Sequence, residues 1–203
     1  MNFTDLISLQ DSPRRTAALA SWVQGLFSVP EKIPVLVGGA AVEILTGGAY
    51  TTTDLDFAGS VTDSVKSLLV KNGFERLGRH WIHETAQVFL EFPSEALDYR
   101  EQAVQMSAHG FDLLVVSIED LLVDRLGAWQ HWKSGIDGAN AYYLYRKCRS
   151  EIDFDRLTRR ALEAGFENAL IALEKFDRKW STSNPDIEEL EAWANQGPTR
   201  ASS

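Results

Sequence analysis

The sequence predicts an α+β protein, in which a small mixed sheet with flanking helices is followed by a helical C-terminal half. Segments with strand and helix periodicity alternate over the first 116 residues, whereas every periodic segment after them has the 3.6-residue period of a helix. The chain has 203 residues, 44% of them hydrophobic, which is enough for one compact body with a helical extension. We expect an α+β domain over residues 1–116, a helical domain over 117–195 and a mobile tail over 196–203.

The first half is expected to open with a helix, a strand and a second helix. Apolar residues recur at nearly helical spacing between residues 13 and 27, which predicts a covering helix. Residues 33–37 form a short apolar run that ends at Gly38 and Gly39, as a buried strand does at a tight turn. A short helix is expected from Ala40 to the next glycine pair, because glycine tolerates the positive φ that ends a helix.

The next predicted strand carries two carboxylates on one face. Residues 54–58 alternate with a period of two, so Leu55 and Phe57 share one face and Asp54 and Asp56 share the other. Aspartate is depleted in strands, so two on the same face require an explanation. Their spacing suits one hard cation held from both sides, or two cations that share a ligand.

Capping patterns and short β-rich runs order the rest of the chain. Ser60 to Asp63 has the spacing of a capping box, which predicts a helix that closes at Asn72-Gly73. Similar patterns predict later helix starts at Ser117, Asp153 and Asn184. Strand-like runs are expected over residues 74–83 and 87–92, and over 103–107 and 111–116 as a hairpin.

Composition excludes several classes of protein. Twenty Lys and Arg against 29 Asp and Glu give a net charge of −9, which opposes the diffuse grip of nonspecific nucleic-acid binders. No stretch approaches the roughly 18 consecutive apolar residues of a membrane span, so neither a membrane protein nor a membrane partner is expected. The single cysteine, Cys148, permits no internal disulfide and no cysteine-based zinc site; it is expected to be a packing residue in a cytoplasmic protein.

The glycine pair and the aspartate pair together describe a site for a metal and a triphosphate. Gly38 and Gly39 lead into a helix, whose first N–H groups lack partners and lie at the positive end of the helix dipole. Glycine also has no side chain to keep a phosphate away. Asp54 and Asp56 offer the carboxylate oxygens that Mg²⁺ prefers.

This arrangement resembles the nucleotidyltransferase superfamily typified by DNA polymerase beta. The pattern of that family is an apolar strand, Gly-Gly or Gly-Ser, a short helix and then Asp-x-Asp on the next strand, matched here by Val-Gly38-Gly39 and Thr53-Asp54-Leu-Asp56. A third carboxylate, usually Asp, lies on a later strand in the family. The resemblance places Glu91 there, and Glu instead of Asp is a departure.

A second stretch resembles bacterial nucleotidyltransferase toxins of the abortive-infection type. Residues 117–129 are similar to the helix that opens the C-terminal half of these toxins, on which a basic residue faces the nucleotide phosphates. Arg125 occupies that place, which is usually filled by Lys. The resemblance covers about residues 33–132 and implies a cognate antitoxin as a partner.

The resemblance implies Mg²⁺-dependent transfer of a nucleotidyl group from a nucleoside triphosphate to an acceptor hydroxyl. Asp54, Asp56 and Glu91 are the implied metal-binding and catalytic residues. The acceptor is left open among an RNA end such as tRNA, a protein and a small molecule. Two alternatives remain, namely a non-catalytic nucleotide-binding module and a metal-dependent phosphoesterase or nuclease that uses the same carboxylates. The β and γ phosphates would contact Gly38, Gly39 and Thr53, and the leaving pyrophosphate would contact Arg125.

Each of these residues also has a plainer interpretation. The glycines could simply end a strand, and the aspartates could be the solvated face of an edge strand. Glu91 could be an outward surface residue, and Arg125 could pair with Glu119 or another surface acid. A zinc site at His80 and His83 is discounted, because residues i and i+3 of a strand point to opposite faces.

Overall fold

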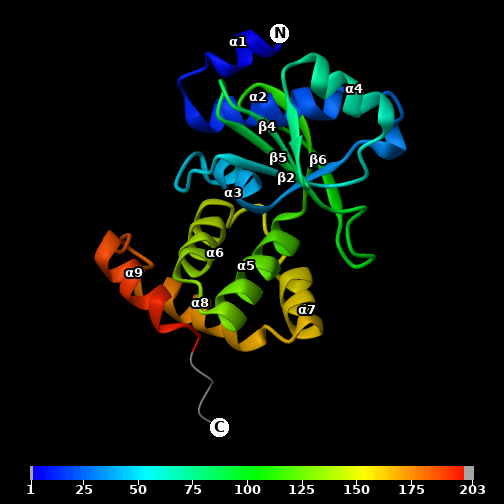
Figure 1. Ribbon diagram of the computed structural model, residues 1–203. Helices are drawn as coiled ribbons and strands as arrows, with labels where there is room; N and C mark the ends of the chain where they lie inside the picture. The colour runs from blue at the N-terminus through cyan, green and yellow to red at the C-terminus, as the bar shows by residue number, and fades with distance from the viewer. Residues whose placement is uncertain (1, 199–203) are drawn as a thin grey trace. The chain divides into compact units, whose positions relative to one another are not determined.

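The computed structural model describes residues 2–198 and confirms the α+β class. The chain divides into two compact units, Met1–Ser117 and Ile118–Ser203. The first unit holds a seven-stranded mixed sheet with helices, and the regular elements of the second, as described, are all helices (Figure 1). Of the expected tail, residues 199–203 lie outside the described part of the chain, and residue 196 still belongs to the last helix.

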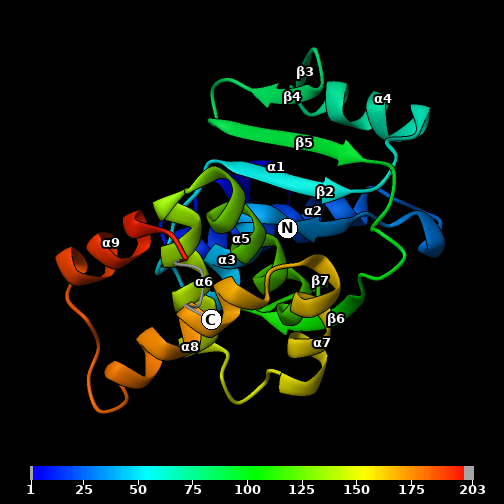
Figure 2. The same cartoon turned by 90° about the horizontal axis from the view of Figure 1, so that it is seen from below.

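The sheet of the first unit has the strand order β3-β4-β5-β2-β1-β7-β6. The pairs β2–β5 and β1–β7 are parallel and the other neighbouring pairs are antiparallel, so the sheet is mixed as expected. Figure 2 shows β2, β5 and β4 side by side. The strands are β1 (Val35–Val37), β2 (Asp54–Ala58), β3 (Glu75–Leu77), β4 (His80–His83), β5 (Val88–Ser94), β6 (Ala103–Ala108) and β7 (Phe111–Val116).

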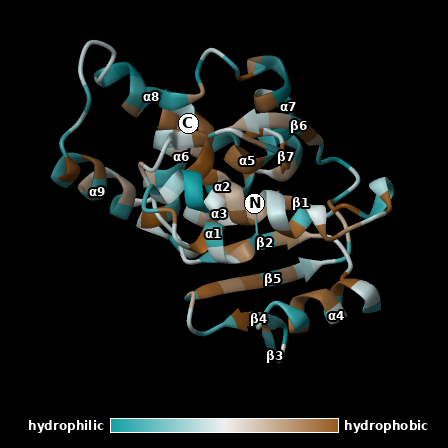
Figure 3. Cartoon of the chain, turned by 90° about the horizontal axis from the view of Figure 1, so that it is seen from above, coloured by the Kyte–Doolittle hydropathy of each residue, from teal (hydrophilic) through white to brown (hydrophobic). Residues whose placement is uncertain are grey.

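Alternation along the central strands gives the sheet an apolar face and a more polar face. Leu36 pairs with Phe57 across β1 and β2, and Leu55 pairs with Leu90 across β2 and β5; all four are at most 3% exposed. In Figure 3, β5 is hydrophobic along much of its length, as expected for a strand between two others. The residues between these buried ones, Asp56 among them, point to the opposite face.

The helices of the first unit include those that position the strand ends. Helix α2 packs against β7, and α3 packs against α2, β1 and β2. The carboxylate of Glu43 on α3 is fully buried and accepts hydrogen bonds from Ser12 and Thr16 of α2, which fixes the two helices to each other. The helices are α1 (Phe3–Ile7), α2 (Ser12–Gly25), α3 (Gly38–Thr46) and α4 (Asp63–Lys71), and a 3₁₀ turn spans Pro30–Lys32.

Several expectations about element ends were wrong. Helix α3 begins at Gly38 rather than Ala40, because the backbone turns within the glycine pair itself. The N-cap of α4 is Thr62 and not Ser60; its hydroxyl accepts from the N–H of Val65. The run 74–83 is a hairpin, β3 and β4, that turns at Gly78 with a φ of +62°.

Between residues 118 and 198 the second unit is a group of five helices. Helix α5 packs against α6, α7 and α8, and α6 also packs against α9. Asp153 caps α7 as expected, whereas the last helix is capped by Asp186 in a capping box with Glu189, and not by Asn184. The helices are α5 (Ile118–Trp132), α6 (Gly135–Lys147), α7 (Phe154–Ala164), α8 (Glu167–Lys179) and α9 (Ile187–Gln196).

The first turn of α5 is tied to α7 by buried ion pairs. The carboxylate of Asp120 is 0% exposed and binds Arg156 at 2.6 Å and Arg160 at 2.8 Å. Glu119 accepts from the backbone N–H of Asp153, the N-cap of α7.

Cys148 is also buried, as expected of a packing residue. Over residues 2–198, no helix is long and apolar enough to cross a membrane.

Candidate functional site

The candidate site begins where β1 passes into α3. Gly38 has a φ of +67°, a conformation that L side chains rarely adopt. A Cβ at this position would lie 2.5 Å from Oδ2 of Asp56, so the backbone of Gly38 and the carboxylate of Asp56 are in close approach. The sequence places glycine here because both the turn and the neighbouring carboxylate require it.

Gly39 lies in the first turn of α3, against the segment that leads to β2. A Cβ on Gly39 would lie 3.2 Å from the Tyr50 ring and 3.5 Å from Cβ of Thr52. The N-cap of α3, Val37, has no side-chain hydrogen bond to the first turn. This helix start therefore resembles an anion-binding terminus in that its N-cap side chain makes no hydrogen bond to the first turn.

The segment before β2 is held by side chains at both of its ends. The N–H of Thr52 donates to the buried Glu43 carboxylate at 3.3 Å, and the Thr52 hydroxyl accepts from the N–H of Asp54 at 3.2 Å. Thr53 donates its hydroxyl to the carboxylate of Asp54, also at 3.2 Å. Glu43 thus acts as an internal anchor for the strand that carries the aspartates. The sequence did not predict this role, because nothing in the pattern of a short helix distinguishes Glu43 from an ordinary polar residue.

Three carboxylates share the polar face of the sheet. Asp54 and Asp56 alternate with the buried Leu55 on β2. Glu91 on β5 is directly opposite Asp56 in the parallel register, so the two side chains point to the same face. The backbone therefore brings Glu91 next to the aspartate pair. Asp54 is exposed and the other two are half-buried.

The side chain of Glu91 is nevertheless held by two cationic or ionisable neighbours. Its Oε1 lies 2.8 Å from Nε of Arg79, and its Oε2 lies 3.3 Å from Nδ1 of His80. His80 is paired with Glu91 across β4 and β5, which extends the row Asp56–Glu91–His80 over three neighbouring strands. Sequence reasoning missed Arg79 and His80, since their proximity to Glu91 depends on the hairpin turn at Gly78.

His83, which a zinc site would pair with His80, lies on the other face. Its ring packs against Phe3 and Phe74 with centroid distances of 5.0 and 5.3 Å, and its Nδ1 accepts from the N–H of Ala86. The rejection of a zinc site at the two histidines is consistent with this packing.

A metal ion at this face would meet hard oxygen ligands from two residues. Asp54 and Asp56 fit Mg²⁺ by ligand type and by their position on one strand face. Within the described chain, no group of three or more His, Cys, Asp and Glu residues is arranged to hold a metal ion, and Glu91 is engaged with Arg79 and His80. Glu91 would have to exchange these partners to become a third ligand.

Arg125 belongs to the second unit. Its guanidinium is 18% exposed and pairs with Asp124 on the same helix and with Asp137 of α6, the latter at 2.7 Å. The pairing with Glu119 considered from the sequence is not present, because Glu119 pairs with Arg156. Arg125 is therefore held by acids of its own unit, and its contact with phosphates stays a prediction.

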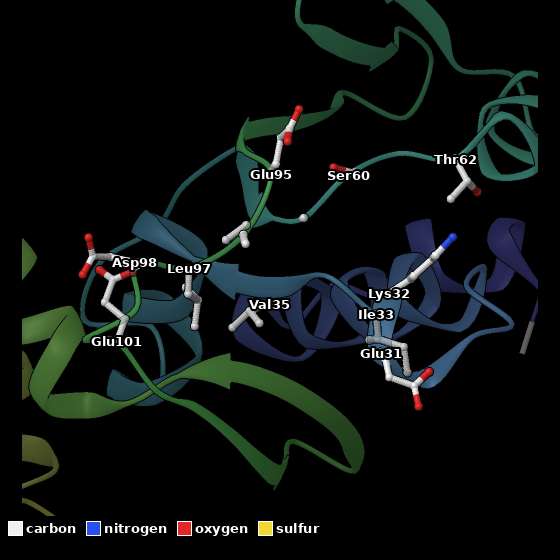
Figure 4. Close-up of a pocket in the computed structure, with 13 residues that line it drawn as sticks. Glu31, Lys32, Ile33, Val35, Ser60, Thr62, Glu95, Leu97, Asp98 and Glu101 are labelled. Carbon is white, nitrogen blue, oxygen red and sulfur yellow. Dashed lines mark hydrogen bonds between the residues drawn. The ribbon is translucent and has the colours of Figure 1, made fainter.

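A pocket opens along the same two strands, at their opposite ends. Val35 and Ala58, which pair across β1 and β2, contribute to a cavity of about 550 Å³. Figure 4 shows Val35 and Leu97 in its middle, with charged side chains around them. These charges are mostly negative, with one cation, and they come from Glu31, Lys32, Glu95, Asp98 and Glu101. Asp98 is itself paired with Arg100 at 2.8 Å.

Comparison with solved structures finds distant likenesses. An antigenic nucleotidyltransferase-like protein from Paracoccidioides brasiliensis superimposes with a TM-score of 0.49 and 14% sequence identity, over 90% of this chain and 93% of that chain. No family model matches the chain, and no curated protein matches it significantly by sequence. A likeness of this degree carries no argument about activity.

Proposed function

We propose that the protein is a Mg²⁺-dependent nucleotidyltransferase, which moves a nucleotidyl group from a nucleoside triphosphate to an acceptor hydroxyl. The observation that carries the proposal is the close approach of Asp56 to Gly38 at the start of α3, with Asp54 on the same strand face. Carboxylates for a cation and N–H donors for phosphates then lie at one strand end. The plainer interpretation of an edge strand does not hold, because β2 lies between β5 and β1 in the sheet.

In this proposal each residue has a defined task. Asp54 and Asp56 would hold Mg²⁺, which supplies positive charge to the triphosphate oxygens. The N–H groups at Gly38 and Gly39 and the hydroxyl of Thr53 would bind the β and γ phosphates. Glu91 would accept the proton of the acceptor hydroxyl after release from Arg79. Arg125 keeps the phosphate-binding role that the resemblance assigns to it.

The acceptor and the biological partners belong to the same proposal. An RNA end such as that of tRNA, a protein and a small molecule are all compatible with a hydroxyl acceptor. The resemblance to abortive-infection toxins favours an antitoxin as partner, and the single cysteine, Cys148, fits a cytoplasmic location.

Calorimetric titration with a nucleoside triphosphate tests the site. We expect Mg²⁺-dependent binding in the unchanged protein and its loss in Asp54→Ala and in Asp56→Ala, because each substitution removes a cation ligand. Asp112→Ala is the matched control, since this exposed strand residue lies on β7 and carries the same charge. Unchanged metal-dependent affinity in both site variants would remove the proposal.

One observation favours the second candidate, a non-catalytic nucleotide-binding module. Glu91 is engaged by Arg79 and His80, which is an arrangement that a residue without catalytic work could also have. The substitution Glu91→Gln separates the two candidates. A transferase should keep its triphosphate affinity within a few fold and release pyrophosphate on the order of a hundredfold more slowly. A binding module should bind nucleotide and release no pyrophosphate with either side chain.

A further inference from the structure

A second cavity of the first unit lies next to the pocket that contains Val35 and Leu97, and its charged side chains are mostly positive rather than mostly negative. It measures about 400 Å³, within the range of roughly 300–1,000 Å³ that is common for small-molecule sites. The two cavities share Gly59, Ser60 and Glu95. We call the second one the basic pocket, because Lys66, Arg76 and Arg79 all line it and Glu95 is its one acid.

The three cations of the basic pocket come from three different elements. Lys66 lies on α4, Arg76 on β3 and Arg79 in the turn between β3 and β4. Three cations against one acid give a local excess of two positive charges in a chain whose net charge is −9. This local excess runs against the charge of the whole chain and favours an anionic ligand.

Each cation keeps donors for such a ligand. Lys66 is 2.8 Å from Asp63, whose side chain is 97% exposed, and an exposed pair of this kind contributes little and exchanges readily. Arg76 donates only its Nε, to the carbonyl of Gly78 at 3.1 Å. The Nε of Arg79 forms an ion pair with the Glu91 carboxylate. Because a guanidinium has five N–H groups in a planar fork, both arginines can still bind a phosphate through their terminal nitrogens.

Two aromatic side chains are also part of the wall of the basic pocket. Trp81 and Phe92 line it, and the ring of Phe92 is stacked on that of Phe57 with a centroid distance of 5.5 Å and an interplanar angle of 21°. A flat, aromatic ligand group can pack against such a wall, whereas a bare inorganic anion gains nothing from it.

We propose that the basic pocket binds the phosphate monoester of a nucleoside 5′-phosphate, with the base against the aromatic wall. This site is separate from the aspartate site of the proposed function. Its cations need no metal to bind phosphate, whereas Asp54 and Asp56 repel an anion when no cation is present. The shared chemistry is a nucleotide phosphate, which a free nucleotide and the 5′-terminal nucleotide of an RNA can both supply.

Arg79 connects the basic pocket to Glu91. The same guanidinium lines the pocket and binds the Glu91 carboxylate, so Glu91 and a bound phosphate compete for it. Removing the negative charge at position 91 should therefore strengthen phosphate binding in the pocket.

The test is a titration of the whole chain with adenosine 5′-monophosphate in the presence of a chelator. We expect saturable binding that is tighter than that of inorganic phosphate or adenosine alone. Arg76→Glu should weaken it about tenfold or more, and Arg178→Glu, an equal charge change on an exposed position of α8, should leave it within about twofold. Glu91→Gln should tighten it a few fold.

Two further arms complete the test. Asp54→Ala should leave the affinity for the monophosphate unchanged, so a failed aspartate site and a failed basic pocket are distinguishable. If RNA supplies the nucleotide phosphate, a 5′-phosphorylated oligoribonucleotide should bind better than the same oligonucleotide with a 5′-hydroxyl end. If a free nucleotide supplies it, neither oligonucleotide should bind in the basic pocket. The proposal would be overturned if adenosine 5′-monophosphate showed no saturable binding up to about 10 mM. It would also be overturned by equal effects of Arg76→Glu and Arg178→Glu, or by tight binding of the 5′-hydroxyl oligonucleotide.

Discussion

Asp120 of the second unit and Asp54 of the first unit are carboxylates in opposite environments. In the second unit, Asp120 is fully buried and both of its oxygens are bound by arginines of α7. In the first unit, Asp54 is exposed on a strand. Its carboxylate accepts a hydrogen bond from the Thr53 hydroxyl, and its backbone N–H donates to the Thr52 hydroxyl. Asp120 has its charge compensated inside the fold, whereas Asp54 has its charge directed to the solvent.

This difference shows how to separate structural acids from candidate functional ones. A buried carboxylate with two guanidinium partners holds helices together, and removing it leaves buried cations without a counter-charge. An exposed strand carboxylate without such partners contributes little to stability, so its substitution can test a binding role without unfolding the protein. Asp177, with Arg146 and Arg149 at 3.1 and 2.8 Å, belongs to the structural kind.

The largest expected effect is the loss of Asp120. Asp120→Ala should lower the free energy of unfolding by about 3–5 kcal/mol, because Arg156 and Arg160 would remain buried without their partner. Asp54→Ala should change it by less than about 1 kcal/mol, as exposed substitutions usually do. Urea unfolding followed by circular dichroism measures both. Equal losses in the two variants would break the comparison between structural and functional acids.

A smaller effect is expected at the glycine that touches Asp56. Gly38→Ala should cost about 2–3 kcal/mol and displace the Asp56 carboxylate, because the residue has a positive φ and its Cβ would lie 2.5 Å from Oδ2. Gly47→Ala is the matched control; its φ is +65° but nothing lies within 4 Å of its Cβ, so only about 1 kcal/mol should be lost. Nucleotide binding should fall in the first variant alone, and a loss of binding in both would assign the effect to the backbone rather than to Asp56.

The smallest effect concerns the buried thiol. Burial raises the pKa of Cys148 to about 11, above the unfolded value of about 8.5. The thiol therefore contributes stability that is fully present below about pH 8.5 and is lost as the pH rises toward 11. Between pH 8 and pH 10 the loss should be on the order of 1 kcal/mol, and it should disappear in Cys148→Ala. Rapid alkylation of the native thiol at pH 8 would contradict this assignment.

The fold and the backbone of the candidate site could largely be predicted from the sequence. Alternation located β2 at the exact residues 54–58, and the parallel register confirms that Glu91 lies beside Asp56. The bounds of β2 depend on local periodicity, which a single sequence contains, whereas the place of Glu91 was implied by the family resemblance. The helix start at Gly38 was placed two residues late, since the sequence alone does not show where within a glycine pair the chain turns.

The side-chain partners of the site could not be predicted, because they depend on tertiary pairing. Arg79 reaches Glu91 only through the hairpin turn at Gly78 and the pairing of β4 with β5. Glu43 becomes an anchor only when α2 and the segment at Thr52 fold around it. Neither relation has a spacing that a pattern could detect.

Transfer from differently labelled triphosphates tests the central claim most directly. The unchanged protein is incubated with Mg²⁺, cell extract as a source of acceptors and a nucleoside triphosphate labelled at the α or the γ phosphate. We expect the α label to move to an acceptor, with the γ label released in pyrophosphate, and both to stop in Asp56→Ala. Release of the γ label as inorganic phosphate without transfer of the α label would identify a phosphoesterase, and tight nucleotide binding with no release of either label would identify a binding module; each result would contradict a nucleotidyltransferase.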